Sequence, residues 1–252
     1  MMSPEEIRAA VAAATWYHAF EVAPGIITPG TIATDARAWF DHVGVPASLA
    51  GKAALDIGSW DGPYAFELER RGARVTAVDI QDPDHTGFNT ARRILNSNAA
   101  YARGSVYDLH RLAPGPFDWV HFRGVFYHLR HPLLAFDRIR EVMSPTGQLI
   151  FEGECILNHI EANPGLEPRL TAAQIRDSNV PLMALYRGHF KDGSNWHIPN
   201  WPAVENWLWA AGLEVVRHQF WENLEQKPFP GQRVLGVARP RTGYNPPEHP
   251  VL

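Results

Sequence analysis

With 252 residues, 45% of them hydrophobic, the chain can bury the core of one α/β domain, and we expect no second independent domain. Its net charge of -4 lacks the cationic excess that dominates nucleic-acid affinity, so we expect no nucleic-acid partner. The single cysteine excludes an intrachain disulfide. We see neither a cationic signal-peptide start nor an apolar run approaching about 18 residues, so we expect a cytoplasmic protein without membrane contact.

The N-terminal segment predicts helices ahead of the first buried strand. Ser3 and Glu6 have the spacing of a capping box, which predicts a helix from residue 4 to Phe20. A loop rich in proline and glycine follows, and then a short helix over residues 35–43. We therefore expect residues 1–45 to form a helical cap.

Further along the chain, apolar strands alternate with amphipathic helices. This alternation predicts an α/β fold with a doubly wound, mostly parallel, seven-stranded sheet. The expected strands lie within residues 52–57, 73–80, 100–109, 117–125, 148–154, 213–221 and 232–239. Residues 156–200 interrupt the alternation, and a segment of this length usually carries function. We expect a main domain over 46–240, with a lid inserted at about 156–200, and a tail over 241–252.

The stretch LDIGSWDG, residues 55–62, is a buried strand that runs into a glycine turn. In a doubly wound sheet this first turn is the usual ligand site. A dinucleotide site would need glycine at the positions of Trp60 and Pro63, where the backbone approaches a pyrophosphate. A P-loop would need a Gly-Lys-Ser/Thr ending, which is absent. Both kinds of nucleotide site are therefore disfavoured.

The remaining pattern is Asp-x-Gly-x-x-x-Gly at Asp56, Gly58 and Gly62, with Asp79 at the end of the next strand. It resembles the S-adenosylmethionine (SAM) site of class I methyltransferases, which have a Rossmann-like fold. SAM has no phosphate, so Trp60 can stand in the turn, and Asp79 is placed to accept both ribose hydroxyls. The resemblance implies SAM as cofactor, S-adenosylhomocysteine (SAH) as product, and these cofactor-binding residues: Asp56, Gly58, Trp60, Gly62, Asp79, Ile80, Ser105, Val106, Asp108, Arg123 and Tyr127.

A closer resemblance covers most of residues 16–240, including FRGVFYHLRHPLLAF and NWHIPNWPAVENWLWAAGLEVVR. These segments resemble the bacterial tRNA wobble-uridine carboxymethyltransferases and their shorter relatives, which are O-methyltransferases of sugars and small metabolites. The tRNA enzymes use carboxy-SAM, whose extra carboxylate is held by a lysine, a tyrosine and an arginine. The match places Tyr127 and Arg233 at two of these positions, but residues 16–18 contain no lysine. We therefore expect SAM as the donor, and no counterpart of the tRNA enzymes' large N-terminal extension.

Methyl transfer to oxygen requires alignment of two substrates and a group that accepts the hydroxyl proton. The candidate catalytic residues are His128 after the fourth strand, His197 in the insertion and Glu154 at the end of the fifth strand. A helix cap is the structural alternative for His128, and a solvated strand end is the alternative for Glu154. A divalent metal held by Glu152, Glu154 and a histidine is compatible with the sequence, but no spacing requires it.

Aromatic and polar side chains in the insertion suit a carbohydrate, although a packed lid without substrate contact is the alternative. The predicted substrate-binding residues are Tyr17, His18, Glu152, Tyr186, Arg187, His189, Trp196 and Arg233. We predict a SAM-dependent O-methyltransferase acting on a sugar, an oligosaccharide or another small molecule. The alternatives are a tRNA wobble-uridine methyl- or carboxymethyltransferase and a SAM-binding accessory protein without turnover. A homo-oligomer is compatible with the sequence.

Overall fold

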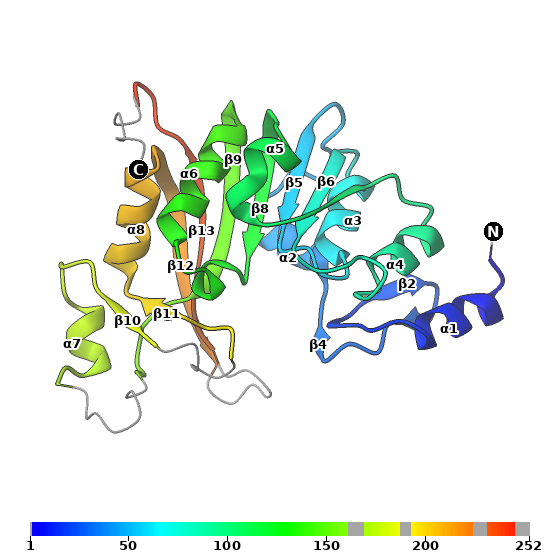
Figure 1. Ribbon diagram of the computed structural model, residues 1–252, viewed down its shortest axis with the longest axis horizontal. Coiled ribbons are helices and arrows are strands. Elements are labelled where there is room, and N and C mark those ends of the chain that lie inside the picture. Colours follow the sequence, from blue (N-terminus) through cyan, green and yellow to red (C-terminus); the bar gives the residue numbers. More distant parts are fainter. Residues whose placement is uncertain (1, 161–168, 187–192, 224–230, 245–252) are drawn as a thin grey trace. The chain divides into compact units, whose positions relative to one another are not determined.

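The computed structural model describes residues 2–160, 169–186, 193–223 and 231–244 (Figure 1). The chain divides into two compact units. Unit 1 comprises Met1–His121 and Val142–Ser144, and unit 2 comprises Phe122–Glu141 and Pro145–Leu252. Within the described ranges, no helix combines the length and the apolar character needed to cross a membrane.

Seven strands form the central sheet, in the order β12-β13-β9-β8-β5-β6-β7, which confirms the predicted fold class. They are Ala53–Ile57 (β5), Arg74–Asp79 (β6), Ala100–Arg103 (β7), Phe117–Arg123 (β8), Met143–Glu154 (β9), Leu213–Asn223 (β12) and Gly231–Pro240 (β13). β6 runs parallel to β5 and β7, whereas β13 runs antiparallel to β9 and β12. Because β5 and β6 are parallel, their last residues, Ile57 and Asp79, lie at the same edge of the sheet.

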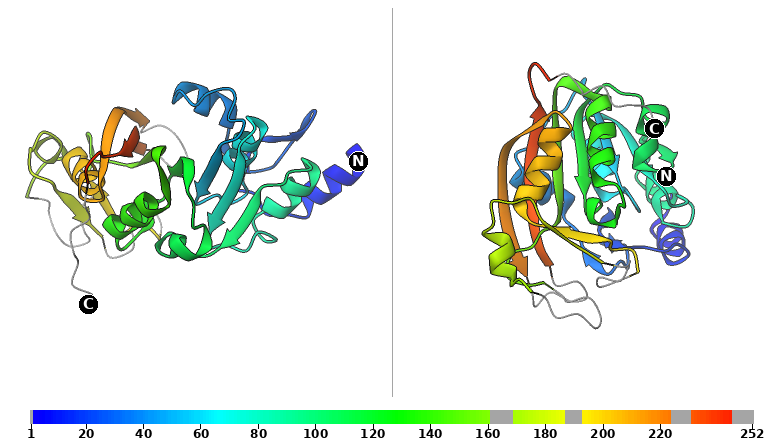
Figure 2. Two further views of the ribbon diagram at one scale, coloured as in Figure 1. Left: turned by 90° about the horizontal axis from the view of Figure 1, so that it is seen from above. Right: turned by 60° about the vertical axis from the view of Figure 1, so that its left-hand side comes forward.

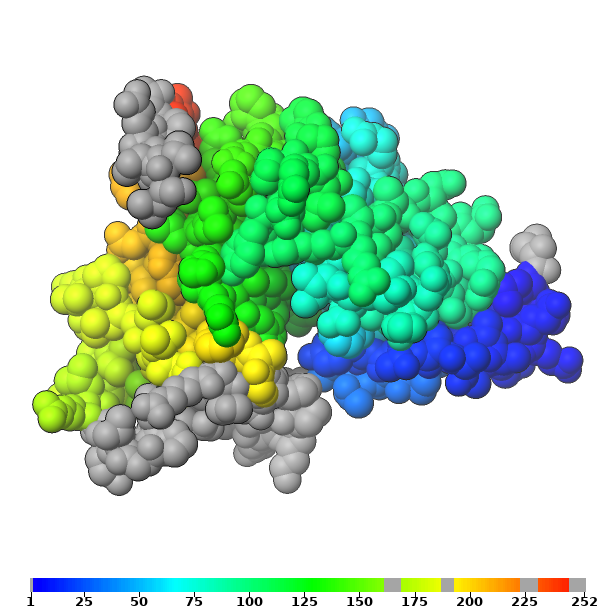
Figure 3. Space-filling view, in the orientation of Figure 1, coloured from blue at the N-terminus to red at the C-terminus, as the bar shows by residue number. Residues whose placement is uncertain are grey.

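Unit 1 contains β5, β6, β7, most of β8 and the N-terminal elements. Its other elements are Pro4–Ala12 (α1), His18–Ala19 (β1), Glu21–Ala23 (β2), Ile26–Ile27 (β3), Ile32–Ala33 (β4), Ala36–His42 (α2), Pro63–Arg70 (α3), Phe88–Ile94 (α4), the 3-10 helix Val106–Asp108 and Leu109–Leu112 (α5). α3 packs against β5 and β6, and α1 packs against α4, where Figure 3 shows the N-terminal residues in dark blue. Phe40, Leu55 and Phe88 are fully buried, and each contributes about 1.5–3 kcal/mol through burial.

The first helix begins as predicted but ends early. Ser3 caps it through the expected capping box. The helix ends at Ala12 rather than Phe20, because the Trp16 indole donates a 2.8 Å hydrogen bond to the Val11 carbonyl and the chain then enters β1 and β2. The segment that we expected to be a helical cap therefore contains four short strands as well as α1 and α2.

Unit 2 contains most of β9 and α6, all of β12 and β13, and the insertion. Its other elements are the 3-10 helix Phe126–His128, Pro132–Val142 (α6), Ala172–Arg176 (α7), Met183–Leu185 (β10), His197–Pro199 (β11) and Trp201–Ala210 (α8). α8 packs on β12, as Figure 2 shows. Phe136 and Ile139, which helical spacing places on the apolar face of α6, are fully buried together with Phe126 and Phe151.

The insertion has a small hydrophobic core of its own. Ile156, Ile175, Tyr186 and Ile198 form this cluster with Ala172, so α7 and the β10–β11 pair are held together by apolar contacts. Asn200 extends it by donating hydrogen bonds to the carbonyls of α7 and of the segment before β10. The described part of the insertion is therefore a packed substructure.

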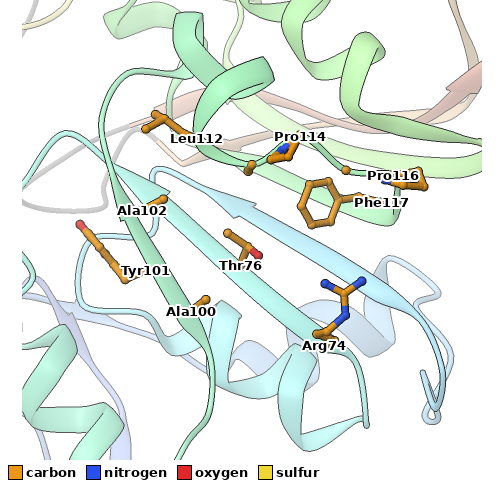
Figure 4. Close-up of a pocket in the computed structure, with 11 residues that line it drawn as sticks. Arg74, Thr76, Ala100, Tyr101, Ala102, Leu112, Pro114, Pro116 and Phe117 are labelled. Carbon is orange, nitrogen blue, oxygen red and sulfur yellow. The ribbon is translucent and has the colours of Figure 1, made fainter.

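A pocket of about 350 Å³ lies in unit 1, where β6 and β7 adjoin the segment that leads into β8 (Figure 4). Arg74, Thr76 and Ala102 line it from the two strands, and Phe117 lines it from the start of β8. Arg74 begins β6 and Asp79 ends it, so the pocket lies toward the opposite end of that strand from Asp79. None of the predicted site residues lines this pocket.

Candidate functional site

The glycine turn after β5 has a backbone path that most side chains disfavour. Gly58, Trp60 and Gly62 have φ angles of 75°, 49° and 87°. A Cβ at Gly62 would also lie 2.7 Å from the Phe88 ring, so only glycine fits there without a shift. Gly62 is the N-cap of α3, which directs the start of this helix into the turn. Trp60 adopts the left-handed region without being glycine, and such strained residues cluster at functional sites.

Asp79 connects the ends of β5 and β6. Its two carboxylate oxygens accept hydrogen bonds from the backbone N–H groups of Trp60 and Gln81, each at 2.9 Å. Burial raises the pKa of Asp79, and these two N–H groups only partly offset that rise. Each oxygen retains a further lone-pair site, so the carboxylate can accept two more donors. The geometry therefore suits the predicted bonds from two ribose hydroxyls, although this role stays a prediction.

Four of the predicted cofactor-binding residues, Ile80, Ser105, Val106 and Asp108, lie around the ends of β6 and β7. Ile80 follows Asp79 and is 64% exposed although it is apolar. Ser105 caps the 3-10 helix that Asp108 ends, and its hydroxyl accepts a hydrogen bond from the Tyr107 backbone N–H. Val106 is buried, and Asp108 is paired with Arg111 on α5. Their contact with cofactor stays a prediction.

Asp56 is part of a buried chain of polar side chains that the sequence analysis missed. Trp39 donates to His121 Nε2 at 3.2 Å, which leaves His121 Nδ1 to donate to Asp56 Oδ1 at 2.7 Å. Asp56 Oδ2 is buried and has no hydrogen-bond partner among the described residues. This oxygen is free to bind a ligand group or a water, and the cofactor-binding role of Asp56 stays a prediction.

A second buried carboxylate, Asp61, joins the turn to the N-terminal segment. Its Oδ2 accepts hydrogen bonds from the backbone N–H groups of Tyr17 and His18 at 2.8 and 2.9 Å, and its Oδ1 accepts from His18 Nδ1. The Tyr17 ring packs against Trp60 at 5.6 Å between centroids. Tyr17 and His18, predicted as substrate-binding residues, are therefore held at the glycine turn by a residue that the sequence analysis did not single out. The sequence signal that could have identified Asp61 is its position, because it is an acidic residue inside the glycine turn, between Trp60 and Gly62.

In unit 2, Arg233 on β13 joins two buried acids on the neighbouring strand β9. It donates two hydrogen bonds to Glu152, the one from Nη2 measuring 3.0 Å, and one to Glu154 at 3.0 Å. Arg123, at the end of β8, is a second cation 3.4 Å from Glu152. Burial alone would lower the pKa of Arg233, but the adjacent acids outweigh it and hold this pKa well above its usual value.

Tyr127 completes this cluster. Arg233 Nη2 donates to its hydroxyl at 3.4 Å, and the guanidinium carbon lies 5.2 Å from the centre of its ring. Burial raises the pKa of Tyr127 to about 12, although the positive charge of Arg233 opposes this rise. Five predicted site residues therefore meet in one charge-balanced cluster: Arg123, Tyr127, Glu152, Glu154 and Arg233. Glu154 is an ion-pair partner here rather than a solvated strand end.

The two histidines proposed as bases have different surroundings. His128 ends the 3-10 helix, and its Nδ1 lies 3.0 Å from the Ser194 hydroxyl. His197 is buried in β11, and its Nε2 donates to the Leu129 carbonyl at 2.9 Å. His197 Nδ1 then carries the lone pair, and it is buried without a hydrogen-bond partner in the described part of the chain. Proton transfer to either ring stays a prediction.

Burial of His197 makes stability depend on pH. Desolvation lowers the pKa of His197, so below its unfolded value of about 6.5 the unfolded chain binds more protons than the folded chain. We expect the free energy of unfolding to fall as pH is lowered from 7 to 5, and to fall less in His197→Gln. Urea unfolding across this range measures both slopes. His110→Gln, at an exposed position on α5, is the control that should keep the wild-type slope; equal slopes in His197→Gln and the wild type would contradict the prediction.

The other predicted acceptor-binding residues lie in the insertion. The Arg130 guanidinium lies 4.2 Å from the centre of the Trp196 ring, and the Trp196 backbone N–H donates to the Tyr127 carbonyl. Tyr186 is buried in the hydrophobic cluster of the insertion. Arg187 and His189 lie outside the described residues. No group of three or more potential metal ligands occurs within the described part of the chain.

The methyltransferase-domain family matches residues 32–218, which include the glycine turn, Asp79 and most of the sheet. The chain belongs to this family. It is a SAM-dependent methyltransferase, in agreement with the prediction from the glycine turn. The strand order, with β13 antiparallel to its neighbours, is the class I arrangement expected of that activity.

Two relatives carry the name tRNA U34 carboxymethyltransferase, which agrees with the resemblance seen in the sequence. The protein from Desulforapulum autotrophicum is 27% identical over 179 residues, covering 71% of this chain and 49% of its own length. The protein from Pseudomonas fluorescens is 30% identical over 171 residues, covering 67% and 48%. This methyltransferase thus spans about half the length of the curated relatives that it matches.

Solved methyltransferases share the fold. The N-terminal domain of EvdMO1, solved with SAH and D-fucose, aligns over 96% of this chain and 98% of its own, with a TM-score of 0.63 and 19% identity. The 1,6-didemethyltoxoflavin-N1-methyltransferase of Burkholderia thailandensis, solved with its substrate and SAH, aligns over 82% and 76%, with a TM-score of 0.55 and 17% identity.

Proposed function

We propose that this methyltransferase transfers the methyl group of SAM to a hydroxyl of a sugar, an oligosaccharide or another small molecule, in the cytoplasm. The main support for SAM as the methyl donor is the Asp79 carboxylate at the carboxyl end of β6. Two backbone N–H groups hold this carboxylate in place, and its remaining lone pairs can accept hydrogen bonds from the ribose of SAM. The buried Oδ2 of Asp56 offers a second acceptor, suited to the ammonium of the methionine moiety. The buried free thiol of Cys155 fits a reducing compartment.

The choice of SAM over carboxy-SAM rests on the surroundings of Arg233. In the tRNA carboxymethyltransferases, which this chain resembles, the corresponding arginine binds the carboxylate of the donor. Here Glu152 and Glu154 already direct two carboxylates at that guanidinium. A third carboxylate would bring three negative charges to one part-buried arginine, with Arg123 as the only compensating cation that the described residues place there, and like charges at such distances repel strongly. The methyl of SAM adds no charge.

A carbohydrate acceptor is supported by the aromatic and polar groups of unit 2 and by one structural relative. Trp196 presents a flat ring, and Ser194 and Asn195 precede it with hydroxyl and amide groups that can bind sugar hydroxyls. The EvdMO1 domain, which shares the fold over nearly its whole length, was solved with D-fucose. Because that likeness is only 19% identical in sequence, the acceptor class belongs to the proposal.

A second function is favoured by the names of the curated relatives. Proteins that are 27% and 30% identical over about two thirds of this chain are called tRNA U34 carboxymethyltransferases. These names weigh against the expectation that nucleic acid is not a partner. Transfer of a methyl or carboxymethyl group to a tRNA wobble uridine is therefore the alternative, and the net charge of -4 is the feature that speaks against it.

The bound cofactor and the labelled product separate these functions. Mass spectrometry of the denatured protein is expected to show SAM or SAH, and carboxy-SAM would overturn the proposed donor. Incubation with methyl-tritiated SAM and a panel of sugars that includes D-fucose is expected to label a sugar. Label in bulk tRNA would instead support the alternative, and label in neither would reject both acceptor classes. The variant Asp79→Ala is the negative control, and its labelling rate gives the background of the assay.

A further inference from the structure

His18 and Asp61 form a buried dyad at the glycine turn. His18 Nδ1 donates to Asp61 Oδ1, and the same carboxylate accepts two backbone N–H bonds through Oδ2. Because a carboxylate oxygen accepts, the proton lies on Nδ1 and the lone pair lies on Nε2. Nε2 has no hydrogen-bond partner among the described residues, while the side chain stays 10% exposed. The ring is therefore in the tautomer that can accept a proton.

The backbone of His18 is held as firmly as its ring. Thr28 Oγ1 donates to the His18 carbonyl at 2.7 Å, and β1 pairs with β4 in parallel at His18 and Ile32. Gly30 packs so closely that a Cβ there would lie 2.1 Å from the His18 carbonyl carbon. The rings of Tyr17 and Tyr64 meet the imidazole edge-on, at 4.8 and 5.9 Å. With its backbone fixed, its Nδ1 bonded and two rings against the imidazole, His18 is preorganised with Nε2 left open.

The dyad is attached to the turn that is expected to hold the methionine end of SAM. Asp61 directly follows Trp60, so their Cα atoms are about 3.8 Å apart. The Trp60 backbone N–H donates to Asp79. Asp61, which orients His18, is thus one peptide unit from Trp60, which donates to the carboxylate predicted to bind the ribose.

We infer that His18 is the proton acceptor of the methyl transfer and that Asp61 is its positioning residue. In this step the acceptor oxygen attacks the methyl carbon, the carbon–sulfur bond breaks, and the hydroxyl proton moves to His18 Nε2. SAH leaves neutral, and the positive charge of the sulfonium ends on the imidazolium, next to the Asp61 carboxylate. The inference rests on the proposed transfer to a hydroxyl, and it gives the role of base to His18 rather than to His128 or His197.

The competing explanation is that the dyad only fastens the N-terminal segment to the turn. A fastening role does not require His18 Nε2 to lie near the charge at the reacting centre. SAM and SAH differ by one methyl group and one positive charge, so the difference between their complexes reports whether that charge is near His18.

The test is nuclear magnetic resonance of the full-length protein with labelled histidine, free and saturated with SAH or SAM. His18→Gln assigns the His18 signals. The expected result is a proton on Nδ1 in the SAH complex and His18 ring-nitrogen chemical shifts that differ between the SAM and SAH complexes, because the sulfonium charge of SAM lies near Nε2. Asp61→Asn is expected to raise the share of the Nε2–H tautomer, which simple fastening does not require.

Each outcome is decisive. Equal His18 ring-nitrogen chemical shifts in the two complexes, or a proton on Nε2 in the wild type, would overturn the inference while leaving the proposed function standing. Failure of both SAM and SAH to bind would overturn the proposed function and the inference with it. His110, at an exposed position on α5, is the internal control whose ring-nitrogen chemical shifts should be the same with SAM and with SAH.

Discussion

Asp79→Ala is expected to weaken SAM binding by about 100-fold, because two charge-assisted hydrogen bonds to the ribose are lost and each is worth about 1.5 to 3 kcal/mol before water compensates. The substitution also removes the acceptor of the Trp60 and Gln81 backbone N–H groups, which loosens the turn. Isothermal titration calorimetry with SAH and with SAM measures the loss, and the melting temperature shows whether the fold is intact.

Asp82→Ala is the matched control for this prediction. Asp82 lies three residues further on, pairs with Arg103 at 3.0 Å and is partly exposed, so its removal changes the same net charge without touching the turn. We expect its affinity for SAM to stay within about threefold of the wild type, since surface pairs contribute little. Equal affinity in Asp79→Ala and Asp82→Ala would mean that the ribose does not bind at the end of β6.

The sequence was sufficient to predict the seven-stranded sheet, because each of its strands carried a local signal. The apolar runs ended in turn residues, and helical spacing placed Phe136 and Ile139 in the core. The early end of α1 could not be predicted in this way. Its cause is the Trp16 indole bonding to the Val11 carbonyl together with four short strands, and both depend on tertiary contacts.

The cofactor turn was the predictable part of the candidate site, since its glycines must adopt positive φ angles at set positions. The polar partners behind the turn were not predictable. His121 looks like one more residue of an apolar strand, and its bond to Asp56 spans 65 positions of the chain. Asp61 likewise meets His18 across 43 positions. Side-chain pairs so distant in sequence leave no periodic pattern.

The ion pairs of Arg233 could not be predicted either. The resemblance to the tRNA enzymes suggested that Arg233 binds a ligand, but it did not show which residues lie next to it. Glu152 and Glu154 are two residues apart on β9, so their side chains point to the same face of the sheet. The antiparallel register then sets Arg233 opposite Glu154. Only the register of β13 against β9 shows that the predicted ligand-binding arginine already has two acidic partners.

Arg233→Met is expected to destabilise unit 2 by about 3–5 kcal/mol, the usual cost of removing one partner from a buried ion pair. Two carboxylates, Glu152 and Glu154, would stay buried, and within the described part of the chain Arg123, which lies 3.4 Å from Glu152, is the one cation left beside them. Methionine has a similar volume and can replace the packing of the arginine stem, so the loss measured by urea unfolding reports mainly on the unpaired charges.

Arg239→Met is the matched control, because Arg239 lies on the same strand and pairs with Glu214 at 2.6 Å where Arg239 is exposed and Glu214 is partly exposed. We expect it to cost no more than about 1 kcal/mol. Adding Glu152→Gln and Glu154→Gln to Arg233→Met should recover part of the stability, since the buried negative charges are then gone. If Arg233→Met costs as little as Arg239→Met, the two acids do not hold the guanidinium in solution. That arginine would then be free to bind the carboxylate of carboxy-SAM, and the case for SAM as the donor would lose its structural support.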